Sequence, residues 1–414
     1  MKIVIVNTVY GKGSVGRICA DLYEELVRSG DEPFMATGRG HLPESVRGCT
    51  IGTFPDFAGH VLKNFFQDAS GFGSERVTRR FISRLEEIAP DVIHLHNIHG
   101  FYLQTELLFD YLKRAGIPVV WTLHDCWPFT GHCAYYDHIQ PWADGAPISE
   151  QTRCSRWITG CHDCPIYRTA YPYALFKDNS EKNWERKKNA YTGVPGLTIV
   201  TPSEWLAGQV KQSFLRDYPV EVLPNGIDLN VFCPASENEK PDNDDRRVVL
   251  GVANNWEERK GLKYFENLAG SLPDNYRLVI VGLNKAQIGR FSKKFKTDRV
   301  LPIARTGSVS ELADLYRNAD VFVNATLEDN FPTTNLEALA CGTPVVTFDT
   351  GGSAESVSEH CGMVVPKGDQ EALKSAIVKV CENRSFDAGS CRERAMLYDK
   401  TDFVRRYIDI YKTV

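Results

Sequence analysis

Two acidic residues in the last third of the chain have a spacing that suits the binding of a phosphorylated ligand. Seven residues lie between Asp329 and Glu337, and Phe331 with Pro332 shapes a turn between them. An apolar run that predicts a strand precedes this turn, and a run that predicts a helix follows it. The segment therefore predicts a strand exit, a polar turn and a helix start, which together form an anion site.

The helix start has its own signature. Thr334 and Glu337 have the spacing of a capping box, in which the two side chains bind first-turn amides. The amides of Thr333, Thr334 and Asn335 are expected to be unpaired and to face a phosphate. Glu337 thus has two open explanations, a ligand contact or capping alone.

The segment Leu327–Asp349 resembles the nucleotide-sugar site of glycosyltransferase family 4, where two acids with this spacing precede a helix reading roughly L-E-A-M-A-x-G-x-P-V-V. The resemblance implies that Glu337 accepts hydrogen bonds from the ribose hydroxyls. It also implies that the first acid lies near the donor sugar. This first acid is usually Glu in the family, and here the position holds Asp329, with Glu328 beside it as the alternative.

Two cations and two strand ends extend this resemblance. Lys260, followed by Gly261, matches a family lysine that neutralises the donor diphosphate. The family's earlier Arg is replaced by Val252 or a neighbour, and Arg259 is the candidate to compensate for it. Gly282 and Thr306 follow predicted strands, at the places where the family packs the nucleotide base.

A histidine at a strand end extends the resemblance into the first half of the chain. The predicted strand Pro118–His124 ends at His124, which Asp125 follows. Ligands of open α/β sheets gather at the carboxyl ends of strands, so both residues are expected to meet the transferred sugar or the acceptor hydroxyl. Three other histidines are expected to be hydrogen-bonded structural residues: His94, His96 and His99.

A glycine-rich loop near the N-terminus has two interpretations. Gly11, Gly13 and Gly16 match G-x-G-x-x-G between the first predicted strand and a helix, a pattern typical of dinucleotide sites. Such a site also needs an acid about 20 residues further on. The second predicted strand ends in Thr37-Gly38-Arg39, so only an NADP site, with Arg39 at the 2′-phosphate, fits.

The family resemblance gives the same loop another role. It places Gly13, Ser14 and Gly16 near the donor's phosphate and the acceptor, and Arg17 is positioned to help. A solvent-exposed arginine in the first helical turn is the structural alternative for Arg17.

Length and periodicity predict an α/β protein with two domains. The 414 residues exceed the usual content of one core, and short β-branched runs alternate with helical spacing. The first sheet is expected to take Ile3–Asn7, Pro33–Thr37, Asp91–His96, Pro118–His124, Leu197–Pro202 and Val220–Leu223. The second is expected to take Arg247–Ala253, Arg277–Gly282, Arg299–Ile303, Asp320–Asn324, Pro344–Phe348 and Gly362–Val365.

The domain boundaries follow from composition and from the resemblance. The polar segment 234–246 predicts a linker between a first domain, 1–233, and a second, 247–394. Apolar residues from Phe403 to Tyr411 predict an amphipathic helix. The resemblance implies the GT-B fold, two facing Rossmann-like domains with a cleft between them, in which residues 395–414 return to the first domain.

Charge and hydropathy exclude other classes of protein. A net charge of −5 and a pI near 6.1 argue against nucleic-acid binding. No apolar run approaches the roughly 18 residues of a transmembrane helix. Met1 leads directly into the first predicted strand without the pattern of a signal peptide, so we expect a cytoplasmic protein.

Five of the twelve cysteines crowd between Cys126 and Cys164. Cys161 and Cys164 form a C-x-x-C, and with Cys133 and Cys154 they could complete a structural zinc site, with His132 or His162 as substitutes. Reduced buried thiols are the alternative. The stretch from Gly131 to Pro165 resembles an insertion in glycosyltransferases of the colanic-acid type.

One further segment bears on membranes. Residues 59–84 mix three phenylalanines with cations: Phe65, Phe66 and Phe72 with Lys63, Arg76, Arg79, Arg80 and Arg84. This composition suits contact with an anionic membrane surface, at the inner face of the membrane, or a solvated helix face.

Taken with the resemblance, these features predict a retaining glycosyltransferase that moves a sugar from a nucleotide-diphosphate donor to a growing, lipid-linked polysaccharide such as an exopolysaccharide or capsule. No metal or other cofactor is expected at the donor phosphates. Two alternatives remain, an NADP-dependent oxidoreductase that uses the N-terminal glycines and a zinc-stapled binding scaffold without catalysis.

Overall fold

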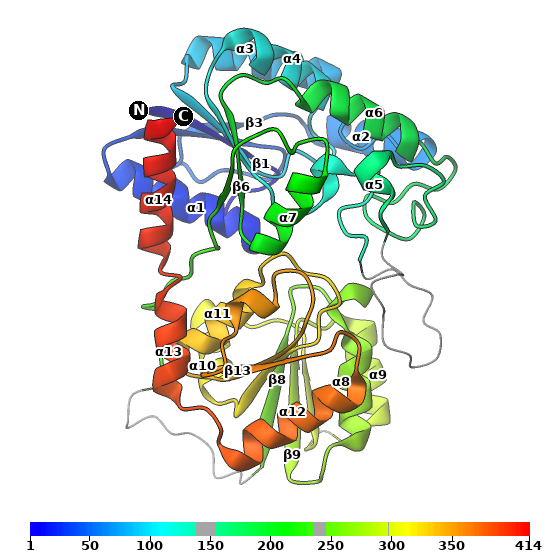
Figure 1. Ribbon diagram of the computed structural model, residues 1–414, viewed down its shortest axis with the longest axis vertical. Helices are drawn as coiled ribbons and strands as arrows, with labels where there is room; N and C mark the ends of the chain where they lie inside the picture. Colours follow the sequence, from blue (N-terminus) through cyan, green and yellow to red (C-terminus); the bar gives the residue numbers. More distant parts are fainter. Residues whose placement is uncertain (138–153, 236–245, 297) are drawn as a thin grey trace. The chain divides into compact units, whose positions relative to one another are not determined.

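The computed structural model describes residues 1–137, 154–235, 246–296 and 298–414, which form two compact units (Figure 1). Of these residues, the first unit takes 1–137, 154–224 and 403–414. The second takes 225–235, 246–296 and 298–402.

The first unit is built on a seven-stranded, wholly parallel sheet in the order β3-β2-β1-β4-β5-β6-β7. Its strands are β1 Lys2–Asn7, β2 Glu32–Thr37, β3 Gly48–Thr50, β4 Val92–Leu95, β5 Val119–Thr122, β6 Leu197–Thr201 and β7 Val220–Val222. Burial on both faces makes the central strands continuously apolar, as parallel sheets require.

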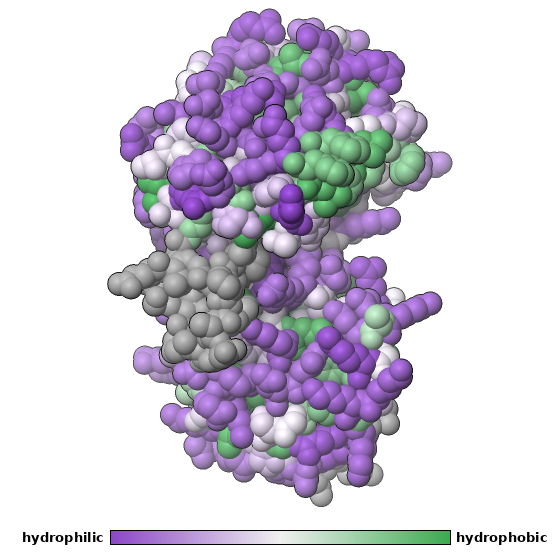
Figure 2. Space-filling model, turned by 90° about the vertical axis from the view of Figure 1, so that its right-hand side faces the viewer, coloured by the Kyte–Doolittle hydropathy of each residue, from purple (hydrophilic) through white to green (hydrophobic). Residues whose placement is uncertain are grey.

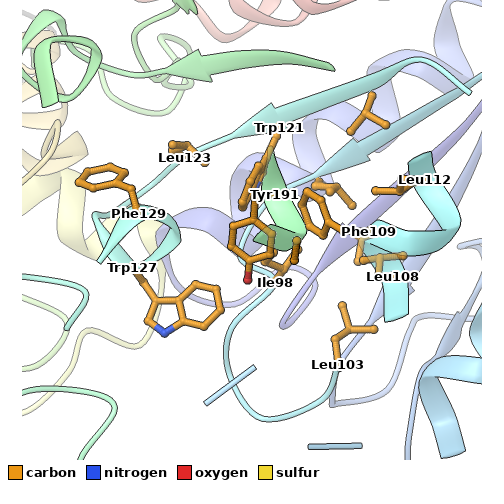
Figure 3. Packing of buried hydrophobic residues seen from close by; sticks show 14 of the residues in the cluster. Ile98, Leu103, Leu108, Phe109, Leu112, Trp121, Leu123, Trp127, Phe129 and Tyr191 are labelled. Atoms are coloured by element: carbon orange, nitrogen blue, oxygen red, sulfur yellow. The ribbon is translucent and has the colours of Figure 1, made fainter. Parts of the chain in front are cut away.

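Helices cover both faces of this sheet. They are α1 Gly13–Arg28, α2 Phe54–Gln67, α3 Glu75–Ile88, α4 Thr105–Ala115, η1 Trp127–Phe129, α5 Arg156–Thr159, α6 Ser180–Tyr191 and α7 Glu204–Gln212. The larger core packs aromatic rings against β5: Phe109 lies 5.2 Å from Trp121 and 4.4 Å from Tyr191, centroid to centroid (Figure 3). Trp127 and Phe129 extend this core beneath the end of β5.

The second unit has a six-stranded parallel sheet in the order β10-β9-β8-β11-β12-β13. Its strands are β8 Arg247–Val252, β9 Tyr276–Val281, β10 Val300–Ile303, β11 Val321–Asn324, β12 Val345–Phe348 and β13 Gly362–Val365. Its helices are η3 Glu258–Lys260, α8 Leu262–Ser271, α9 Lys285–Lys294, α10 Val309–Arg317, α11 Thr333–Ala340, η4 Ala354–Ser356, α12 Gln370–Asn383 and α13 Ala388–Met396. Two apolar cores lie in this unit, and both units are Rossmann-like.

The last helix, α14 Lys400–Thr413, packs on the first unit, as the amphipathic pattern predicts. Phe403, Val404, Tyr407 and Tyr411 enter the same buried cluster as Ile3 and Ile5 of β1. The hydroxyl of Tyr411 lies 2.6 Å from Nδ1 of His94 on β4, so the contact has a polar component as well.

All twelve predicted strands form, with ends shifted by a residue or two. The prediction missed β3, which is three residues long, lies at the sheet edge and has too little periodicity to detect. No helix in the described ranges is long and apolar enough to cross a membrane.

The predicted domain boundaries need correction. The second unit begins at Asn225 rather than after the linker, because Ile227 and Phe232 pack into its core and Arg317 donates to the carbonyls of Val231 and Cys233. The chain rejoins the first unit at Phe403 rather than 395, because α13 packs on α11. Most of the predicted linker, 236–245, lies outside the described residues.

Candidate functional site

The acidic segment of the second unit folds as strand, turn and helix. β11 ends at Asn324, and α11 begins at Thr333, directly after Pro332. The fixed φ of proline suits a residue at the start of a helix. Thr334 therefore lies inside the first turn, where it cannot be the N-cap, and α11 has no side-chain cap. The predicted capping box is wrong.

Glu337 has another partner. The hydroxyl of Tyr316, on α10, donates to Oε2 of Glu337 across 3.0 Å, and the Glu337 residue is only 4% exposed. Burying a carboxylate is costly unless hydrogen bonds satisfy it. Because capping does not occur, the capping explanation of Glu337 is removed, while a ligand contact remains a prediction.

The amide of Asn335 is not available to an anion. It donates to the carbonyl of Pro332 at 3.2 Å, so the expectation of an unpaired amide is wrong at this residue. The buried Asn335 side chain accepts a hydrogen bond from Asn324 at 2.8 Å and donates to Ser356 at 2.9 Å. Asn335 therefore fixes α11 against the end of β11, and Thr333 and Thr334 remain as the predicted phosphate-facing residues.

Lys260 and Asp329 form an ion pair, although 69 positions separate them in sequence. Burial acts to raise the pKa of Asp329, but the cations of Lys260 and Arg259 outweigh it, so this pKa lies below its ordinary value. The pairing identifies Asp329, rather than Glu328, as the acid that meets the lysine.

Backbone contacts hold this ion pair in register. The amide of Leu327 donates to the carbonyl of Arg259 at 2.6 Å, and the guanidinium of Arg259 donates to the carbonyl of Glu328 at 3.1 Å. Arg259 thus lies beside Asp329 together with Lys260. Two cations therefore gather at one acid.

Glycine is required at two positions around this site. Gly351 has φ +55°, and an added Cβ would lie 1.9 Å from the carbonyl oxygen of Asp329. The amide of Gly352 donates to that same oxygen at 3.0 Å, so the loop after β12 holds the backbone of Asp329 in place. Gly282 has φ +97°, and its Cβ would lie 1.7 Å from the carbonyl oxygen of Ala253, which brings the ends of β8 and β9 together.

The remaining predicted residues of the second unit flank these elements. Phe331 is buried, and its carbonyl accepts a hydrogen bond from the Asn225 side chain at 3.1 Å. Thr306 follows β10 and is partly exposed. Its neighbour Arg305 donates to Oδ1 of Asn254, just after β8, at 3.0 Å. No local pattern of residues marks this pair, because 51 positions separate the two residues.

In the first unit, the glycine loop is exposed and tightly turned. Gly11 and Gly13 both have φ +65°, and the amide of Gly11 donates to the carbonyl of Gly16 at 2.8 Å. α1 begins at Gly13, and Gly13, Ser14 and Arg17 are exposed at its first turn. Gly16 is buried against Val9.

His124 and Asp125 follow β5, and histidines from the end of β4 hold both. His96 Nδ1 lies 2.9 Å from His124 Nε2, and His99 Nε2 lies 2.9 Å from Asp125 Oδ2. Burial lowers the pKa of His124 to about 4, so its imidazole is neutral at pH 7. One His124 nitrogen is engaged by His96, which leaves Nδ1 as the atom for a ligand.

Asp125 is almost completely buried. The amide of Trp127 donates to its second oxygen at 3.0 Å. Burial acts to raise the pKa of Asp125, but His99 and this amide outweigh it and lower the pKa. Both carboxylate oxygens therefore have partners within the protein, which points to a positioning role.

The expectation for the other histidines holds for His94, which bridges Tyr411 and, at 2.8 Å, Thr122. His96 and His99 are hydrogen-bonded too, but their partners are predicted site residues. Sequence reasoning missed this link, although the spacing H-x-H-x-x-H after a strand was visible.

The structure does not support the zinc site. Across the described ranges, no group of three or more His, Cys, Asp or Glu side chains is arranged to hold a metal ion. His132 binds Asp68 at 2.6 Å instead, and burial raises the pKa of Cys161 to about 11 and of Cys164 to about 12.

A buried lysine of α6, Lys187, ties this helix to the segment after β5. It donates to the carbonyls of Trp127 at 2.7 Å and Thr130 at 3.0 Å.

Comparisons with protein families match most of the chain. The model described as "Glycosyltransferase Family 4" matches residues 15–231, and that described as "Glycosyl transferases group 1" matches residues 246–383. The first match covers most of the first unit and continues to residue 231 of the second, and the second match lies within the second unit.

Individual relatives carry related names. A putative colanic acid biosynthesis glycosyl transferase, WcaC, of Escherichia coli is 21% identical over the full length of both chains. An N,N'-diacetylbacillosaminyl-diphospho-undecaprenol alpha-1,3-N-acetylgalactosaminyltransferase of Campylobacter jejuni is 29% identical over 46% of this chain and 53% of its own.

Solved structures match the whole chain in fold. Sucrose-phosphate synthase from Thermosynechococcus elongatus gives a TM-score of 0.70 at 17% identity, covering 100% of this chain and 98% of its own. HepE from Anabaena, in complex with UDP, gives 0.64 at 15% identity and covers both chains completely. These likenesses show the GT-B fold, and they give the oxidoreductase and scaffold alternatives no support.

Proposed function

Because the chain belongs to glycosyltransferase family 4, we propose that it transfers a sugar from a nucleotide-diphosphate donor to a lipid-linked, growing polysaccharide, with retention of configuration at the anomeric carbon. The observation that carries this proposal is the ion pair of Lys260 and Asp329 beside α11, whose buried Glu337 occupies the family's second acid position. HepE, which has the same fold, has been solved with UDP.

The second unit is proposed to bind the donor. Lys260, with Arg259, neutralises the diphosphate, and the first-turn amides of Thr333 and Thr334 donate to it. Glu337 accepts hydrogen bonds from the ribose, while Asp329 contacts the sugar.

The base is proposed to pack near Gly282 and Thr306, with Phe331 shaping the turn. Arg305 takes the place of the missing family arginine, because it reaches Asn254 in the loop after β8 where that arginine was expected. Fixed positive charge is what the leaving diphosphate needs as its negative charge increases, so no metal ion is required in this proposal.

The first unit is proposed to serve the transferred sugar and the acceptor. His124, which is neutral and held by His96, donates or accepts a hydrogen bond through Nδ1, and Asp125 keeps this strand end in position. The loop that carries the exposed residues Gly13, Ser14 and Arg17 and the buried Gly16 is proposed to serve the donor phosphate and the acceptor. During transfer the acceptor oxygen bonds to the anomeric carbon as the bond to the diphosphate breaks, and the acceptor proton leaves with the diphosphate.

The names of two relatives support the proposed acceptor. The Campylobacter jejuni protein and an Escherichia coli galactosyltransferase, 24% identical over 48% of this chain and 54% of its own, are both named for acceptors on diphospho-undecaprenol. We therefore propose a polyprenyl-diphosphate glycan as acceptor, with peripheral contact to the membrane that carries it.

A transfer assay tests this proposal. The protein is incubated with UDP-, GDP- and ADP-sugars and polyprenyl-diphosphate-linked glycans, and the product's anomeric configuration is read by NMR. We expect one donor to be used with retention, and Glu337→Gln to lose most of that activity. Inverted product would overturn the retaining mechanism, and activity only on free, unlinked glycans would overturn the acceptor.

A further inference from the structure

Helix α2 buries two polar side chains and exposes three large apolar ones. Its only fully buried residues are His60 and Asn64, which are held by hydrogen bonds to Ser74 and to the carbonyl of Tyr173. Phe54, Leu62 and Phe66 are instead 79%, 56% and 55% exposed. A surface helix of a globular protein normally has the opposite arrangement.

A second segment extends the apolar surface. Tyr173, Leu175 and Phe176 are 44%, 48% and 65% exposed. The segment runs beside α2, because the amide of Leu175 donates to the carbonyl of Phe65 at 2.9 Å and the ring of Phe176 stacks on Phe66 at 5.0 Å. Figure 2 shows a continuous hydrophobic area over this side of the first unit.

We call this area the α2 surface: Phe54, Leu62, Phe66, Tyr173, Leu175 and Phe176. These are six of the eleven large hydrophobic residues that are exposed among the described residues, and they come from α2 and from the segment beside it. Scattered exposed apolar residues need no explanation, but a contiguous patch marks an interaction site.

Cations border the α2 surface. Lys177 follows Phe176 and is exposed, and the guanidinium of Arg39 lies 5.2 Å from the ring of Phe57, one turn from Phe54. The one acid of α2, Asp56, is neutralised by Arg76, whose side chain is 70% exposed. Arg39 and Lys177 therefore place positive charge at the border, which complements an anionic partner.

We propose that the α2 surface docks onto a bilayer of anionic phospholipid, with its aromatic and leucine side chains at the headgroup boundary and the cations Arg39 and Lys177 on lipid phosphates. Aromatic and leucine side chains beside basic residues are the composition of helices that lie in a membrane interface. The choice of a bilayer rests on the proposed lipid-linked acceptor, whose sugar-bearing end lies at such an interface.

The α2 surface only partly overlaps residues 59–84, the segment for which the sequence suggested contact with a membrane. Phe72 is buried, Phe65 is partly buried, and Arg84 is paired with Glu87. Of the three phenylalanines only Phe66 is exposed, and most of the apolar contact comes from outside that segment, at Phe54 and at residues 173–176.

Vesicle co-sedimentation tests the proposal without donor or acceptor. The result for membrane binding is therefore valid even if the proposed transfer reaction is not observed. The full chain is mixed with vesicles of phosphatidylglycerol and phosphatidylcholine, or of phosphatidylcholine alone. We expect binding to the anionic vesicles, weakened about tenfold or more by the triple substitution Phe54→Ser, Leu62→Ser, Phe66→Ser. Lys177→Glu should weaken binding to the anionic vesicles selectively.

The matched control replaces two exposed apolar residues of the second unit, Met396→Ser with Leu397→Ser, which are 57% and 69% exposed. This variant should bind vesicles as the original chain does. Thermal unfolding and far-UV circular dichroism should be unchanged in both variants, which excludes misfolding as the cause. Equal vesicle binding by the triple variant and the original chain would overturn the proposal. A second outcome would also overturn it: the original chain fails to bind vesicles and forms a dimer, and the triple variant is a monomer. The α2 surface would then be an interface between two copies of the chain.

Discussion

Lys260 and Asp329 depend on each other, because both side chains are largely removed from water. Lys260→Met would leave the carboxylate of Asp329 without its main cation, and we expect the free energy of unfolding to fall by about 2 kcal/mol. Adding Asp329→Asn removes the stranded charge, so the double variant should regain most of this stability. Urea unfolding of the original chain and of these two variants measures both changes in stability.

Activity should separate from stability in the same variants. The proposed role of Lys260 is to stabilise the leaving diphosphate, a task that a neutral pair cannot perform. We expect the double variant to transfer sugar about 100-fold or more slowly than the original chain while remaining folded. A stable double variant with full kcat would show that the pair is structural only.

His96 is predicted to position His124 through the bond between Nδ1 and Nε2. His96→Leu removes this bond, whereas His96→Asn retains a polar group in nearly the same place. We expect kcat for transfer to fall about tenfold or more in the leucine variant, with the donor KM little changed and partial rescue by asparagine. Steady-state kinetics measure this, and an equal loss in both variants would argue against a positioning role.

At the scale of elements, the loop after β12 is predicted to hold Asp329 in place. Gly351→Ala forces a side chain onto φ +55° and against the Asp329 carbonyl. We expect it to reduce the free energy of unfolding by more than about 1 kcal/mol and to weaken donor binding. Thermal unfolding and calorimetric titration measure the two effects.

The matched control is Gly270→Ala within α8, where an added Cβ meets nothing within 4 Å. Alanine favours the helix over glycine, so this variant should be as stable as the original chain or more so, by up to about 1 kcal/mol. If both glycine variants lost donor binding to the same extent, the conclusion that the loop after β12 positions Asp329 for the donor would be wrong.

Elements were easier to predict than contacts. Short, continuous apolar runs identify the strands because burial in a parallel sheet dictates their composition, and α14 follows from the spacing of Phe403, Tyr407 and Tyr411. The capping box failed because T-x-x-E is compatible with two helix starts, and Pro332 selects the earlier one. The pairs Arg305 with Asn254 and His99 with Asp125 were not predicted, since local patterns carry no information about which loops meet.

At the scale of the whole molecule, buried neutral histidines should make the fold sensitive to acid. Burial lowers the pKa of His60 to about 4 and the pKa values of His94 and His96 well below their ordinary range. The unfolded chain takes up these protons near pH 6.5, so the stability is complete above that pH and is lost as the pH falls toward 4.

Each such histidine contributes up to about 1.4 kcal/mol per pH unit in this window. Urea unfolding at pH 7 and pH 5 should show the loss, and His60→Gln should reduce its slope. His360, whose side chain is 76% exposed, supplies the control: His360→Gln should leave the slope unchanged. Equal slopes for the original chain and His60→Gln would refute the buried-histidine account.

The central claim is that the second unit binds a nucleotide diphosphate through Lys260 and Glu337. Calorimetric titration with UDP, GDP, ADP and NADPH, on the original chain and on Glu337→Gln, tests it most directly. We predict that one diphosphate binds and that its affinity falls about tenfold or more in the variant, as the lost ribose hydrogen bonds require. Binding of NADPH alone, unchanged by Glu337→Gln, would contradict the claim and move the site to the glycines of the first unit.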